Sequence, residues 1–76
     1  MNRYEKRIDG LRAVEVLCYS VCLHLLIEEQ RANLAAKAAL IDLYADERFW
    51  ELEGRDRECR VRQLAVSRSI QAMQNR

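Results

Sequence analysis

The residues of this sequence that come nearest to a catalytic arrangement are Ser20, His24 and Glu28, which follow one another at intervals of four. On a helix this spacing aligns the three side chains in the order of nucleophile, base and orienting carboxylate. No glycine-rich turn nearby offers backbone amides to an oxyanion, and the chain has no second histidine. We therefore predict no catalytic site, and we expect a structural or interface role for His24.

The three cysteines raise the question of a metal site, because thiolates are zinc ligands. Cys18 and Cys22 lie one helical turn apart, whereas Cys59 is distant in sequence. His24 would point about 160° away from Cys22 on a helix, and two short-spaced cysteine pairs are absent. We expect the cysteines to be free, largely buried thiols, with no metal and no cofactor. Their odd number does not resemble a secreted disulfide scaffold, which favours a reducing cytoplasm.

Nucleic-acid binding is suggested by residues 55–76, which carry six arginines and two acidic residues although the whole chain has a net charge of only +1. Placed on a helix, these arginines scatter around the whole circumference, whereas a phosphate-binding helix gathers its positive charge on one face. Most of them also follow an acidic residue by four positions, the spacing of helical ion pairs. A small DNA-binding transcription regulator is thus the alternative and not the first interpretation. The preference for arginine over lysine is typical of GC-rich bacterial or phage genomes.

The helix that must position everything else is the run 11–27, LRAVEVLCYSVCLHLLI, which is apolar on nearly every side. A helix of this kind is normally buried in a core or in a membrane. A membrane span needs about 20 apolar residues, and charged residues interrupt or close this run at both ends. We therefore expect the central helix of a bundle and no membrane segment.

The rest of the chain also favours helices, because it has no proline, two glycines and no alternating strand pattern. We predict one all-α domain over residues 1–76, with helices at about 3–30, 33–53 and 55–74. The polar residues 28–33 would form the first turn, and Gly54 would break the second helix from the third. Acid-before-base pairs across Gly54 leave an alternative, a two-helix hairpin with an unbroken helix over 34–74.

Each predicted helix carries a second apolar group besides its inward stripe. In the second helix one apolar stripe occupies a narrower sector of the helix circumference than the other apolar group. We predict that this stripe is the packing seam that contacts the first helix; it consists of Leu34, Ala38, Ile41, Ala45, Phe49 and Leu52. A chain of 76 residues cannot bury both groups of every helix, so the surplus predicts association. The residues expected at a dimer or partner interface are Leu40, Leu43, Trp50, Tyr19, Leu23, Leu26, Val61 and Leu64.

The sequence thus predicts a small non-enzymatic module that binds protein: an adaptor, a chaperone-like protein or an inhibitor that covers a surface of a larger partner. The bundle would be completed by a homodimer. Trp50 would either anchor the contact, because tryptophan often dominates interface energies, or pack on another helix of the same chain.

Overall fold

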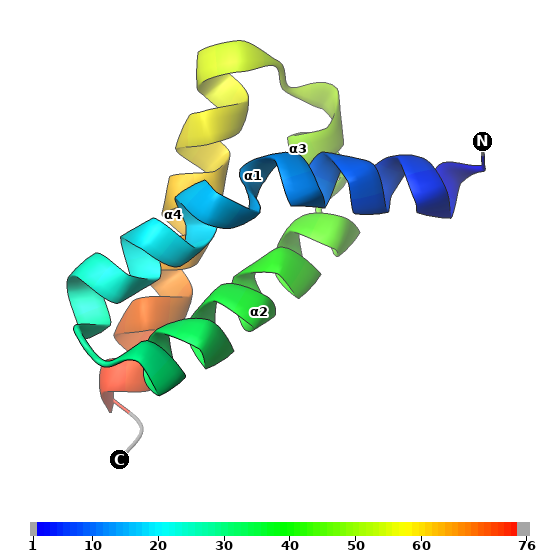
Figure 1. Cartoon of the computed structure of the whole chain (residues 1–76). Coiled ribbons are helices and arrows are strands. Elements are labelled where there is room, and N and C mark those ends of the chain that lie inside the picture. The colour runs from blue at the N-terminus through cyan, green and yellow to red at the C-terminus, as the bar shows by residue number, and fades with distance from the viewer. Residues whose placement is uncertain (1, 75–76) are drawn as a thin grey trace.

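The computed structural model describes residues 2–74, which form four helices and contain no strand. These are α1 (Arg3–Leu26), α2 (Glu29–Ala45), α3 (Glu47–Glu51) and α4 (Gly54–Gln74) (Figure 1). The all-α prediction is confirmed. The expected three helices become four, because the short α3 separates from the predicted second helix.

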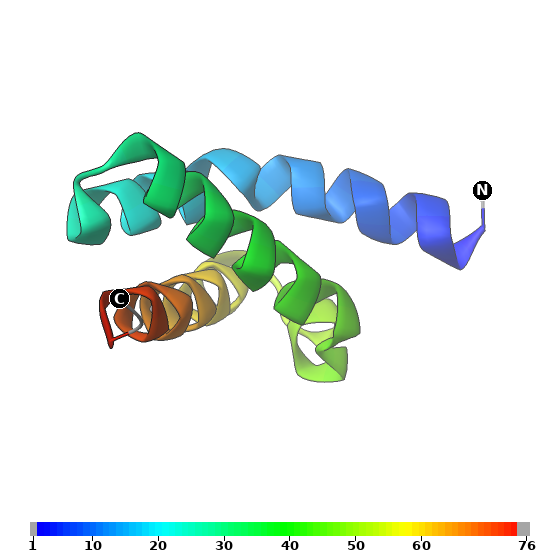
Figure 2. The same ribbon diagram turned by 90° about the horizontal axis from the view of Figure 1, so that it is seen from below.

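The three long helices pack around one core, and each of them contacts the other two. α1 and α2 form a helical hairpin, and α4 crosses behind them after α3 has carried the chain over (Figure 1). Seen from below, α2 runs obliquely from the end of α1 toward α3, and α4 lies on one side of α1 (Figure 2). α3 sits beside the amino-terminal half of α1, so that it closes one end of the bundle.

α1 starts and ends with clear backbone signals. The side chain of Asn2 caps its start by accepting from the Glu5 amide at 2.8 Å. Its end comes at Leu26 and not near residue 30, because Ile27 adopts the left-handed conformation with φ 68°. The Ile27 amide donates back to the Leu23 carbonyl at 2.8 Å, and α2 begins two residues later. The turn predicted over residues 28–33 is therefore wrong, since most of that stretch lies in α2.

The bounds predicted for the second helix, residues 33–53, are wrong, because α2 begins earlier and ends earlier than predicted. α2 starts at Glu29 and stops at Ala45, where the Asp46 amide donates to the Leu43 carbonyl. The Asp46 carboxylate then caps α3 by accepting from the Arg48 amide at 3.2 Å. Because the helix is interrupted before α3, the Phe49 side chain points into the core, where it has no exposed surface. Burial of the Phe49 ring stabilises this interrupted arrangement over the continuous helix that the apolar pattern predicts.

The predicted break at Gly54 is confirmed, and the unbroken helix over 34–74 is wrong. α3 ends at Glu51 and Leu52 is extended, after which Gly54 takes a positive φ of 57° and begins α4. Glycine reaches this conformation without the steric cost that a side chain brings.

Most of the core side chains of the bundle are small. From α1, α2 and α4 the core contains Val14, Cys18, Cys22, Leu26, Ala32, Ala35, Ala36, Ala39, Leu43, Val61, Ala65 and Ser69. The seam predicted for α2 is wrong, because Leu34 and Ile41 are 68% and 70% exposed. The alanine face of α2 points inward instead, since short side chains allow three helix backbones to approach closely.

Replacement of Ile27 by glycine should stabilise the fold. A left-handed conformation costs a residue with a side chain about 1–2 kcal/mol, and Ile27 is 82% exposed, so little burial is lost. We expect Ile27→Gly to raise the free energy of unfolding by up to about 1 kcal/mol in urea titrations. Val16→Gly, also at an exposed position but inside α1, should lower it by roughly 0.5 kcal/mol. Equal losses in both variants would contradict the strain at Ile27.

Asp46 should contribute to stability in two separable ways. The hydrogen bond from Arg60 lowers the pKa of Asp46 below its ordinary 3.8, and the same carboxylate caps α3. Asp46→Asn keeps the cap and should cost less than about 1 kcal/mol, whereas Asp46→Ala should cost about 1 kcal/mol more. Because the folded pKa is lowered, this stabilisation is present above pH 3.8 and is lost as the pH falls below it. Stability of Asp46→Asn should therefore fall less than that of wild type between pH 5 and pH 2; identical acid profiles would contradict the ion pair.

Candidate functional site

An apolar groove lies between the first half of α1 and the second half of α2. It is a hollow of about 280 Å³, and aliphatic and tyrosine side chains make up its whole lining: Tyr4, Ile8, Leu11, Leu40, Ile41 and Tyr44. The two tyrosine rings meet edge to face, with centroids 6.1 Å apart. No charged residue lines the groove, so water inside it gains little hydrogen bonding.

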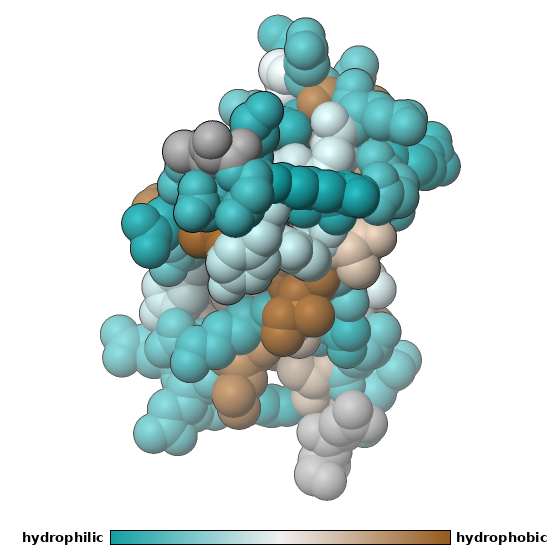
Figure 3. All heavy atoms as spheres, turned by 90° about the vertical axis from the view of Figure 1, so that its right-hand side faces the viewer, coloured by the Kyte–Doolittle hydropathy of each residue, from teal (hydrophilic) through white to brown (hydrophobic). Residues whose placement is uncertain are grey.

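The side chains around this groove are unusually open to solvent. Tyr4 is 61% exposed and Ile41 is 70% exposed, although both belong to well-formed helices. Figure 3 shows brown and pale side chains forming a band across this side of the molecule between polar margins. We call the groove together with Leu34 and Ala38 of α2 the apolar face. Contiguous exposed apolar surfaces of this kind usually mark interaction sites.

The end of α2 that forms one wall of the groove is fixed by Arg7. Its guanidinium donates to the Tyr44 carbonyl at 2.6 Å and to both Glu47 carboxylate oxygens at 3.1 Å. The Trp50 indole donates to the same carbonyl at 3.0 Å. The last carbonyls of a helix lack partners within it and carry its negative dipole end, so a cation is favourable there.

A second ion pair holds α4 against α2 beside the apolar face. Arg68 binds Asp42 in a bidentate manner, at 2.6 and 2.8 Å, and this hydrogen bonding lowers the pKa of Asp42. The Arg68 side chain also lines a hollow at the end of the apolar face, next to Leu34 and Ala38. This polar margin borders the apolar surface, as is typical of protein interfaces.

The predicted interface residues lie mostly inside or against the core of a single chain. Leu43 and Val61 have no exposed surface and Leu26 has 9%, so the side chains of Leu43 and Val61 are not available to a partner. Tyr19, Leu23, Trp50 and Leu64 pack against the core and are partly buried, and only Leu40 lines the groove. The groove and its surroundings also contain Tyr4, Ile8, Leu34 and Ile41, which are outside the predicted interface set. Leu34 and Ile41 belong to the stripe that the sequence predicts to be the packing seam of the second helix, and both are exposed.

The residues considered for catalysis do not form a joined arrangement. Ser20 and His24 are exposed on α1, whereas Glu28 lies beyond the end of that helix and precedes α2. No hydrogen bond links these three side chains among the described residues. Because α1 ends before Ile27, Glu28 does not lie on the same helix as Ser20 and His24, and the three side chains are not aligned.

The cysteines are divided between core and surface. Cys18 and Cys22 are fully buried, and their thiols lie 3.7 and 3.8 Å from the carbonyl oxygens of Ala36 and Ala65. Burial, with the neighbouring Cys22, raises the pKa of Cys18 to about 12. Cys59 is exposed on α4. Within residues 2–74 no group of three or more histidine, cysteine or acidic residues is placed to hold a metal ion.

The arginines of α4 are largely engaged within the chain. Arg60 pairs with Asp46, Arg68 pairs with Asp42, and the Arg57 guanidinium lies 4.7 Å from the centre of the Phe49 ring. Arg55 and Arg62 are exposed. Arg76, the last arginine of the predicted basic segment, lies outside the described residues. No helix of the described chain has the length and apolarity required to cross a membrane.

Comparisons with protein families, with curated proteins and with solved structures gave no match to this chain.

Thiol labelling should distinguish the three cysteines. We expect one thiol per chain to react with Ellman's reagent under native conditions at pH 8, and three in guanidinium chloride. The physical reason is that only Cys59 is exposed, and that the raised pKa keeps Cys18 protonated while thiolate is the reactive form. Cys59→Ser should abolish the fast native reaction. Rapid native labelling of that variant would contradict the burial of Cys18 and Cys22.

Proposed function

We propose that this chain is a small non-enzymatic protein-binding module that acts through the apolar face on α1 and α2. The single observation that carries the proposal is the exposure of Tyr4 and Ile41 around a groove without charged lining, continued along α2 by the exposed Leu34. Each of these side chains would lose unfavourable contact with water on binding. Burial of apolar surface contributes about 25 cal/mol per Å².

The partner that we propose first is a second copy of the same chain. A 76-residue bundle with a core rich in alanine and cysteine buries limited apolar volume and would gain stability from association. A two-fold axis over the apolar face would set Ile41 and Leu34 of each copy against the other copy. An interface of this kind is self-complementary, because the same residues serve both sides.

The role in a larger assembly would be that of an adaptor, chaperone-like protein or inhibitor. The support for a binding role over a catalytic one is that the exposed features are apolar, while Ser20, His24 and Glu28 are not joined. The free thiols buried in the core support a reducing cytoplasm as the compartment.

Molar mass in solution tests the homodimer directly. Light scattering on a sizing column should give about 18 kDa, twice the 9.0 kDa of one chain, and should fall toward 9.0 kDa on dilution. Ile41→Glu should weaken dimerisation at least about a hundredfold, because it places an unpaired charge in the contact. Circular dichroism should show unchanged helix content in this variant, since Ile41 contributes little to the core.

Val16→Glu is the matched control for the dimer experiment. Val16 is 76% exposed on α1 but lines neither the groove nor the hollow beside it. This variant should dimerise as wild type does. A wild-type mass of 9.0 kDa at every concentration, or equal effects of the two glutamates, would overturn the homodimer through this face.

A further inference from the structure

Trp50 stands in a cluster of cations at the end of the bundle closed by α3. The hollow around its indole has a volume of about 470 Å³ and is lined by four basic residues besides Gly10 and Trp50 itself: Arg3, Lys6, Arg7 and Arg57. No acidic residue lines it. α1, α3 and α4 each contribute to this hollow, so only the folded chain brings these charges together.

The position of the indole is fixed by two close contacts. Its nitrogen donates to the Tyr44 carbonyl, and its ring edge presses on the backbone of α1 at Gly10. A Cβ atom at Gly10 would lie only 2.6 Å from Cζ3 of the ring, so a larger residue there would displace Trp50. The glycine inside an unbroken helix is thus explained by this approach.

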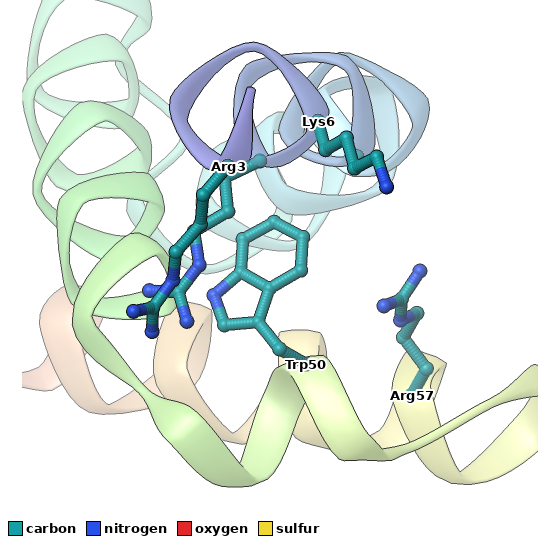
Figure 4. Close-up of a pocket in the computed structure, with 6 residues that line it drawn as sticks. Arg3, Lys6, Trp50 and Arg57 are labelled. Atoms are coloured by element: carbon teal, nitrogen blue, oxygen red, sulfur yellow. The ribbon is translucent and has the colours of Figure 1, made fainter. Parts of the chain in front are cut away.

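The cations on the two sides of the ring differ in their partners. On one side Arg3 and Arg7 both bind Glu47, at 2.9 and 3.1 Å. On the other side Lys6 and Arg57 point into the same open space beside the ring (Figure 4). No described residue forms an ion pair with either of these two, so their charges face each other without an anion between them.

Arg57 shows a further sign of an incomplete site. Its Nε is buried without a hydrogen-bond partner among the described residues, and its guanidinium lies over both Phe49 and Trp50. It also stands near the start of α4, where the positive end of the helix dipole adds to the local potential. The contacts with the two rings stabilise the guanidinium and hold it in place, and an anion in the open space would offset the unfavourable potential between the two cations.

We propose that Lys6, Arg57 and the face of Trp50 form a binding site for a phosphate dianion. Lysine supplies a mobile ammonium and arginine a planar fork of donors, and together they suit the several oxygens of a phosphate group. Lys6 and Arg57 together carry two positive charges in one hollow. They therefore balance a phosphate with two negative charges better than a phosphodiester, which carries one negative charge per phosphate. The phosphate could be free or carried by a small phosphomonoester, and the indole would then flank the ester group. This site lies beside the apolar face on α1 but uses none of its residues.

Intrinsic fluorescence provides a direct assay, because Trp50 is the single tryptophan of the chain. Inorganic phosphate and phosphoserine are titrated separately at pH 7.5, with sodium chloride added to hold the ionic strength constant. A saturable change in emission with either probe, absent with chloride alone, is expected. Equal affinities assign the site to free phosphate, and tighter binding of phosphoserine assigns it to a monoester.

Charge-removing variants test the residues named. Lys6→Gln and Arg57→Gln should each weaken binding about tenfold, the value of one charge-assisted hydrogen bond. Lys37→Gln and Arg55→Gln are the matched controls, since both residues are exposed and outside the hollow. They should bind as wild type. Melting curves identify any variant that fails to fold, and the Arg57→Lys variant should keep part of the affinity.

Three results would overturn the proposal. The first is no saturable emission change with either probe, and the second is equal weakening in all four glutamine variants, which would show a diffuse charge effect. The third is tighter binding of a random duplex DNA than of phosphoserine at equal ionic strength, which would assign the cations to a nucleic-acid backbone.

Discussion

The close approach of three helices through small side chains is the constraint on which the rest of the structure depends. Where α1 meets α2, the thiol of Cys18 faces the backbone of Ala36, and where it meets α4, Cys22 faces Ala65 in the same way. Leucine or isoleucine at these positions would force the helices apart. Leu34 and Ile41 of α2 are therefore placed outside, and the apolar face is a consequence of how the core is packed.

The second determining contact is the junction that Arg7 forms with the end of α2. One carbonyl, that of Tyr44, accepts from both Arg7 and Trp50, which ties α1, α2 and α3 at a single point. Arg7 is 8% exposed, so its charge depends on Glu47 and on the helix dipole for compensation. This junction orients Tyr44 toward the groove and the Trp50 ring toward the cationic hollow.

Two surfaces of opposite character thus border the start of α1. The apolar face should gain from the hydrophobic effect and respond little to salt, whereas attraction at the cationic hollow should be screened as ionic strength rises. Tyr4 and Lys6 are two residues apart on the helix and so belong to different sides of it. A single helix can in this way serve an apolar partner and an anionic ligand without sharing side chains.

The sequence by itself determined the helical class, the course of α1 from residue 3, the break at Gly54 and the surplus of apolar faces, because these follow from local propensity and composition. Only the tertiary structure decided which face of α2 turns inward and where α2 ends. The two apolar stripes of α2 are similarly apolar in sequence but differ in side-chain volume. Side-chain volume decides which stripe is buried only when a neighbouring helix packs against α2. The grouping of Lys6 with Arg57 was equally invisible, since residues 51 positions apart meet only through packing.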